Sequence, residues 1–219
     1  MFFTNRKLNK MVINDLLKIS QVISEKQVNG KEFSDFLNKY EFIDKTYLNL
    51  ILKKNGLLCF ESALQIYPYD NSTINLKILN DMEGWRQKYF FITRSYFCFA
   101  QDLFGFQFCF TERGVEIFNT EIGEFEFLAK NFEQWTQMIL DDYNYLTGYE
   151  IAHEWQTQFG KLKINERLSG KIPFILGGDY SIENLYSINF TNLVEFRADL
   201  ANQIYNLEDG QQIILKHVL

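Results

Sequence analysis

The 219-residue sequence is poor in proline, histidine and cysteine, with two, two and three residues respectively. The low proline content argues against extended linkers and, together with 22 Phe, 12 Tyr and 3 Trp, favours strands and packed helices. Three cysteines are too few for a disulfide framework. We therefore expect Cys59, Cys98 and Cys109 to be buried free thiols, with Cys98 and Cys109 facing each other across a hairpin.

Long apolar runs are also missing. None approaches the roughly 18 residues that indicate a membrane-spanning helix. Neither the apolar core nor the small-residue cleavage site of a secretory signal occurs in the N-terminal segment MFFTNRKLNKMVINDLL. We therefore expect a soluble, cytoplasmic protein without a membrane partner.

Negative charge predominates, and it is unevenly placed. The formal net charge is −6. Residues 1–56 carry a net charge of +4 and residues 57–219 one of −10, and the segment 112–154 has 10 acidic residues against Arg113 and Lys130. This field would repel a nucleic-acid backbone, so we expect no direct nucleic-acid binding. A basic partner would instead be attracted to the segment 112–154.

The N-terminal part shows apolar residues at helical spacing. The pattern predicts one helix near residues 10–26 and a second that contains Phe33, Phe36, Leu37 and Tyr40. A third is predicted to begin after Asp44 as its N-cap and to end before Asn55-Gly56.

After Gly56 the apolar residues tend to recur at every second position, which is typical of strands. The aromatic residues of this region are suited either to core packing or to a stacking platform, and the acidic surroundings favour the core. Predicted strands lie in the runs 57–60, 64–67, 89–99 and 106–110, followed by a hairpin with turns at 112–114 and 121–123.

Helices are predicted again from Asn131, which with Gln134 resembles a capping box. A short helix follows and is closed by Gly160, and the segment 162–172 is expected to be irregular. A strand at 184–188, a helix at 194–205 and a final strand at 211–218 complete the prediction. No repeat or flexible linker occurs, so we expect one α+β domain over residues 1–219.

Motifs that would carry chemistry are weak. His153 and His217 have no second ligand at metal-binding spacing, and no nucleophile elbow occurs. Gly177-Gly178 suits a tight turn better than a phosphate loop, and Asp141-Asp142 suits an exposed helix surface. We therefore expect no cofactor, no metal site and no enzymatic activity.

The strongest candidate site is a group of glutamates around the second hairpin. Glu116, Glu124 and Glu126 would share the solvent face if the alternating apolar residues pointed inward, and Glu112 and Glu121 lie near the turns. Such a face suits a basic protein partner. The alternative interpretation is the ordinary soluble surface of an acidic protein.

The run FCFAQDLFGFQFCF at Phe97–Phe110 resembles the Phe-Ala-Glu-Asp-x-Phe-Gly-x-Gln-Phe signature of the SUKH superfamily, the Smi/Knr-type family. Gln101 stands where the signature has an acid. The resemblance covers residues 45–218, with residues 1–44 as an N-terminal helical extension. It continues in order through Gly114-Val115, Glu121-Ile122-Gly123-Glu124, Phe132-Glu133-Gln134-Trp135, Leu146-Thr147-Gly148-Tyr149, Glu154-Trp155-Gln156, Glu166-Arg167-Leu168, Pro173-Phe174-Ile175-Leu176-Gly177-Gly178, Asn184-Leu185-Tyr186, Phe196-Arg197-Ala198-Asp199-Leu200-Ala201 and Asp209-Gly210.

The resemblance implies an α+β fold with an antiparallel, strongly bent sheet flanked by helices. It also implies membership of a family rich in bacterial immunity proteins, which bind and neutralise a toxin that is often a nuclease. Our first hypothesis is therefore an immunity protein for a cognate basic toxin, bound through Glu112, Glu116, Glu121, Glu124 and Glu126. The alternative is a regulatory scaffold of the Smi/Knr type that binds an endogenous protein. The sequence carries no signal for an oligomeric state.

Overall fold

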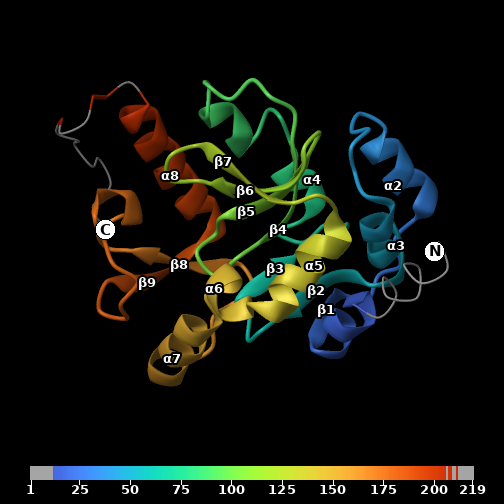
Figure 1. Ribbon diagram of the computed structural model, residues 1–219, viewed down its shortest axis with the longest axis horizontal. Coiled ribbons are helices and arrows are strands. Elements are labelled where there is room, and N and C mark those ends of the chain that lie inside the picture. Colours follow the sequence, from blue (N-terminus) through green and yellow to red (C-terminus); the bar gives the residue numbers. More distant parts are fainter. Residues whose placement is uncertain (1–11, 206, 209–210, 212–219) are drawn as a thin grey trace.

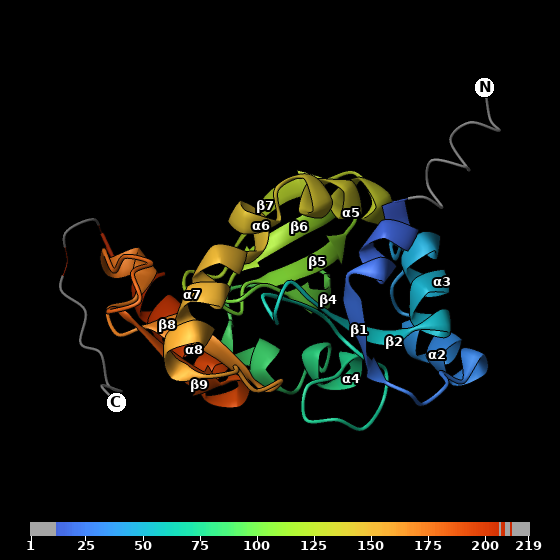
Figure 2. The ribbon, with the colours of Figure 1, turned by 90° about the horizontal axis from the view of Figure 1, so that it is seen from below.

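The computed structural model describes residues 12–205, 207–208 and 211. Its centre is an antiparallel sheet of seven strands in sequential order, β1 to β7, and a two-stranded sheet pairs β8 with β9. The large sheet is open and bent, with helices against its faces (Figures 1 and 2), which confirms the predicted α+β class. The strands are β1 (Ser20–Ser24), β2 (Asn55–Cys59), β3 (Leu64–Ile66), β4 (Phe97–Gln101), β5 (Gln107–Thr111), β6 (Gly114–Asn119), β7 (Glu124–Ala129), β8 (Glu166–Gly170) and β9 (Leu185–Asn189).

The helices begin largely where the sequence places their caps. Asp44 accepts a hydrogen bond from the backbone N of Thr46 at 2.6 Å, and Asn131 accepts one from Gln134 N at 2.9 Å. Each cap satisfies a backbone donor that the first helical turn leaves free. The helices are α2 (Gly30–Leu37), α3 (Lys45–Lys53), α4 (Leu76–Leu79), α5 (Phe132–Asp141), α6 (Tyr143–Thr147), α7 (Tyr149–Phe159) and α8 (Phe190–Ile204), with 3₁₀ turns at Trp85–Lys88 and Phe174–Leu176.

The main core lies between the sheet and helices α3 and α5. Tyr47 on α3 packs against Phe99 and Phe110 of the sheet, with ring centroids 5.4 and 5.2 Å apart. From α5, Trp135 packs edge-on against Phe99 at 5.0 Å. These side chains are fully buried. Burying each ring stabilises the fold by about 1.5–3 kcal/mol, so this part of the aromatic content serves packing.

The opposite sheet face is covered by residues 81–96. Trp85 and Tyr89 of this segment contact Phe118 of β6, and Tyr89 Oη donates to Thr120 O at 2.7 Å. The strand predicted over 89–99 therefore exists only from Phe97 onward. Tyr89 and Tyr96 lie in an irregular segment over the sheet, so their burial does not come from strand pairing.

Two further predictions are wrong. Residues 12–18 are helical, but the helix predicted near 10–26 ends there because Val22 pairs with Leu57 as part of edge strand β1. The segment 162–172, predicted to be irregular, contains β8, which pairs with β9 along its whole length. The final strand predicted at 211–218 lies outside the described residues except for Gln211.

The three cysteines are buried and free, as predicted. Cys98 and Cys109 lie directly opposite each other on β4 and β5, with their sulfur atoms 3.3 Å apart. Desolvation by burial, followed by the hydrogen bond and charge of Cys98, raises the pKa of the Cys109 thiol well above its ordinary value. Cys109 therefore stays protonated, and both side chains contribute to the packing of the sheet.

A carboxylate-rimmed cavity

The β6–β7 hairpin divides its glutamates between two faces. Ile117 lies opposite Glu126, and Asn119 lies opposite Glu124. From Glu116 to Asn119, the number of each β6 residue and that of the β7 residue opposite it add up to an odd number. An even-numbered residue of this stretch therefore shares a face with odd-numbered residues on β7. The prediction that Glu116 shares a face with Glu124 and Glu126 is therefore wrong.

Glu116 is 0% exposed, beneath the segment 81–96. Its carboxylate forms ion pairs with Arg94 and with Arg113, whose Nη1 lies 3.1 Å from Oε1. Arg94 also stacks over the ring of Phe125, with its guanidinium carbon 4.6 Å from the ring centroid. Both oxygens of Glu116 are thus engaged within the protein, so this residue is not available to a partner.

Glu121 is also buried, with 1% exposed, and not on the surface as predicted. Its Oε1 lies 3.3 Å from Nη2 of Arg197 on α8, and its Oε2 accepts a hydrogen bond from the backbone N of Ile175 at 2.9 Å. Arg197 is itself fully buried and donates from Nη1 to Thr120 Oγ1 at 2.9 Å. Glu121 therefore connects the β6–β7 turn to α8 and to the chain after β8.

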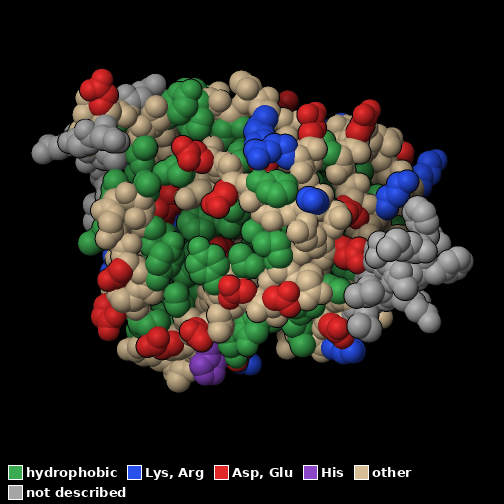
Figure 3. All heavy atoms as spheres, viewed as in Figure 1, with side chains coloured by type: hydrophobic (Ala, Val, Ile, Leu, Met, Phe, Trp, Pro, Cys, Tyr) green, Lys and Arg blue, Asp and Glu red, His purple; other side chains and the backbone are tan. Residues whose placement is uncertain are grey.

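Glu112, Glu124 and Glu126 are exposed, as predicted. Glu112 lies in the turn between β5 and β6, whereas Glu124 and Glu126 line a cavity of about 580 Å³. Figure 3 shows hydrophobic side chains gathered in a hollow on this side of the molecule, with acidic side chains spaced around them. The hairpin thus presents two of the five predicted glutamates at the rim of a concave, largely apolar surface.

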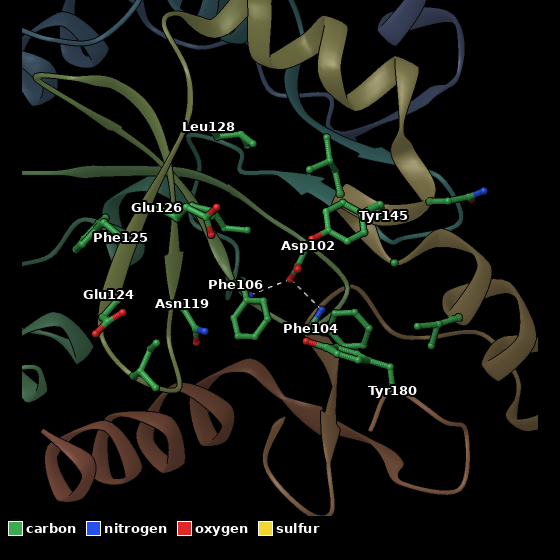
Figure 4. Close-up of a pocket in the computed structure, with 16 residues that line it drawn as sticks. Asp102, Phe104, Phe106, Asn119, Glu124, Phe125, Glu126, Leu128, Tyr145 and Tyr180 are labelled. Carbon is green, nitrogen blue, oxygen red and sulfur yellow. Dashed lines mark hydrogen bonds between the residues drawn. The ribbon is translucent and has the colours of Figure 1, made fainter. Parts of the chain in front are cut away.

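The cavity is built by the β4–β5 turn, strands β6 and β7, helices α6 and α7, and Tyr180. Strands β6 and β7 supply Ile117, Asn119 and Leu128, and α6 supplies Tyr145. Tyr180, after the 3₁₀ turn Phe174–Leu176, completes the wall. Figure 4 shows Asn119, Leu128, Tyr145 and Tyr180 around the turn that joins β4 to β5.

Asp102, in that turn, lies at the base of the cavity and is 5% exposed. Its Oδ1 accepts hydrogen bonds from the backbone N of Phe104 and of Phe106, both at 2.9 Å. Burial raises the pKa of Asp102 to about 7, against the opposing effects of these hydrogen bonds and of Arg197. Within the described part of the chain, no cationic side chain forms an ion pair with it. Functional sites often contain a carboxyl group in a cavity whose pKa is strongly raised.

Asp102 is not among the site residues predicted from the sequence, although it lies within the motif at Phe97–Phe110. The local signal is an acid followed by Leu-Phe-Gly-Phe, in which the side chain can cap the backbone of its own turn. Gly105 adopts a positive φ of 79°, and a Cβ there would lie 2.7 Å from Leu193 Cδ2. The turn that holds Asp102 in place therefore requires glycine at this position.

The remaining candidates lie elsewhere. His153 on α7 lies 3.1 Å from the carboxylate of Glu61 at the surface, and His217 lies outside the described residues. Asp142 caps α6, and Gly177 ends the 3₁₀ turn Phe174–Leu176 in the left-handed conformation. Among the described residues, no three His, Cys, Asp or Glu side chains are grouped as metal ligands would be.

No protein-family model and no curated protein matches the chain. Among solved structures, the fold is similar to that of Atu4351 from Agrobacterium tumefaciens, with a TM-score of 0.55 and 14% sequence identity over 84% of this chain and 87% of that one. At this identity the similarity concerns the fold alone. Over the part of the chain that the structure describes, no helix combines the length and apolar character needed to cross a membrane.

Proposed function

We propose that this protein is a bacterial immunity protein that binds and neutralises a basic protein toxin through the cavity face. The observation that carries the proposal is the acidic cavity itself. Glu124 and Glu126 stand exposed at its rim, and the carboxyl group of Asp102 lies at its base without an ion-pair partner in the described chain. The resemblance of residues 45–218 to the SUKH superfamily supports the choice of a toxin as partner.

Charge complementarity gives such a face a defined role. The segment 112–154 carries a net charge of −8, while two of its acids, Glu116 and Glu121, are neutralised by arginines inside the fold. The acids that remain exposed produce a field that accelerates encounter with a basic protein. A nuclease toxin has a basic surface for its phosphate-rich substrate, and a carboxylate face would compete for that surface.

The test begins with the partner. The full chain is used as bait in lysate of the native strain at moderate salt, and bound proteins are eluted at high salt. We expect a basic protein that stops growth when it is expressed alone and does not when it is co-expressed with this chain. An endogenous complex without toxicity would contradict the immunity role and favour a regulatory scaffold.

The face is tested with the purified pair. Replacing Glu124 and Glu126 together by lysine is expected to lower the association rate constant about tenfold at low salt, because both charges that steer the partner are reversed. Replacing Glu112 and Glu154 together by lysine is the matched control, since both are exposed and neither lines the cavity. Equal effects of the two double variants would show that only overall charge matters.

A further inference from the structure

We propose that the cavity is a recognition pocket for one cationic side chain of the partner, a lysine or an arginine, whose charged end is bound by Asp102. This inference rests on the proposed function, because it names the group of the toxin that the cavity face would recognise. The occupant follows from the residues of the cavity: a fixed carboxylate at the base, aromatic walls and acids at the rim.

The base of the pocket is preorganised. Two backbone N–H groups bind Oδ1 of Asp102, so the carboxyl group cannot turn away, and among the described residues no hydrogen bond reaches Oδ2. Figure 4 shows Asp102, Glu126 and Tyr145 pointing toward one another from different elements. A cation between them would meet the carboxylate without the entropic cost of ordering it.

The walls suit the rest of such a side chain. Phe104 and Tyr180 contact each other with centroids 4.9 Å apart, and Tyr145 stands opposite them across Asp102 in Figure 4. Burial and the nearby charge of Asp102 raise the pKa of Tyr180. The methylene groups of a lysine or arginine would pack on these rings, and the ring faces would attract its charge.

The internal cations near Asp102 are engaged elsewhere. On α8, Arg197 is paired with Glu121 and donates to Phe104 O, and on β8, Arg167 donates to Gln65 and to Glu166 O. The other ionisable groups that line the cavity are Glu124 and Glu126 of β7, Tyr145 of α6 and Tyr180. Burial raises the pKa of Asp102 to about 7. A bound cation would therefore displace the proton of Asp102 and bind more tightly at pH 8 than at pH 6.

The experiment uses the full chain and the probe N-acetyl-lysine methylamide, with the arginine and norleucine analogues for comparison. Titration calorimetry should show saturable binding of the two cationic probes and none of the neutral norleucine analogue. Asp102→Asn should weaken binding about tenfold and abolish its pH dependence, since one charge-assisted contact is lost. Glu112→Gln should leave binding unchanged.

Folding of the variants is controlled separately. If Asp102→Asn unfolds the protein, Tyr180→Ala replaces it, because Tyr180 is 45% exposed and removing its ring opens the wall with little effect on the core. It should also weaken binding of the cationic probes. Equal binding of the norleucine analogue, or undiminished binding by a folded Asp102 or Tyr180 variant, would overturn the pocket.

Failure of the pocket and failure of the proposed function give different results. A toxin whose affinity depends on Glu124 and Glu126 but not on Asp102 would uphold the function and overturn the pocket. Binding of the cationic probes through Asp102, in a protein that protects cells against no basic toxin, would uphold the pocket and overturn the function.

Discussion

The acidic residues on the two faces of the β6–β7 hairpin have opposite environments. On the face covered by residues 81–96, Glu116 is buried and both of its oxygens contact arginines. On the cavity face, Glu124 and Glu126 are exposed, and the buried carboxyl group of Asp102 has no ion pair within the described chain. The comparison shows that the number of acids in a segment does not identify a binding surface. What matters is whether the fold already supplies each acid with a cation.

The same contrast holds between Glu121 and Asp102, which are both buried near Arg197. Glu121 is paired with that arginine, whereas Asp102 relies on two backbone N–H groups. A buried ion pair is retained because either partner alone would be a buried charge. An unpaired acid instead titrates at a higher pH and remains available for an external cation.

The largest expected effect on stability concerns the buried ion pair of Glu121 and Arg197. Glu121→Gln should lower the free energy of unfolding by about 3–5 kcal/mol, because it leaves the charge of Arg197 buried without compensation. Urea unfolding measures this loss. The control is Glu124→Gln in the following strand, where an exposed acid is removed and the change should stay within about 0.5 kcal/mol. Similar losses in both variants would remove the distinction between paired and exposed acids.

The next largest expected effect is a dependence of the free energy of unfolding on pH. The pKa of Asp102 is raised from its ordinary value of 3.8 to about 7 in the fold, so between these values the folded protein binds a proton that the unfolded chain releases. Stability from this group is therefore highest below about pH 4 and falls as the pH rises to 7, with a slope of at most about 1.4 kcal/mol per pH unit. The difference in unfolding free energy between the wild type and Asp102→Asn should decrease across this window. Parallel pH profiles would show that Asp102 is not desolvated.

Local signals predicted much of the fold. Asp44 and Asn131 cap the predicted helices, and Cys98 and Cys109 meet across their hairpin. These features depend on residues that are close in the sequence. The errors arise where tertiary contacts decide: Val22 lies in a strand because β2 offers it an edge, and Tyr89 is buried by an irregular segment that covers Phe118.

The site was harder to predict than the fold. The alternation of apolar and acidic residues shows that β6 and β7 each have two different faces. Which face of β6 continues into which face of β7 depends on the register between the strands, and odd or even residue numbers alone do not give that register. The partners of Glu121 come from distant parts of the chain, so its burial has no local signal. Asp102 had a local signal, its turn motif, but its place in a cavity depends on Tyr145 and Tyr180, far along the chain.

The smallest expected effect separates the two arginines that neutralise Glu116. Arg113 is 62% exposed at its side chain and Arg94 is 35% exposed. Because Arg113 is largely exposed to water and Arg94 still pairs with Glu116, Arg113→Gln should cost only about 0.2–1 kcal/mol of stability, and salt at about 1 M should abolish the difference from the wild type. Arg94→Gln should cost more and respond less to salt, since Arg94 is less exposed and lies closer to the ring of Phe125, at 4.6 Å, than Arg113 does to the ring of Phe127, at 5.7 Å. Urea unfolding at low and high salt measures both variants. If Arg113→Gln lowered the free energy of unfolding more than Arg94→Gln, the solvent-exposed arginine would be the main partner of Glu116. The burial of Glu116 would then no longer identify it as an acid neutralised inside the fold.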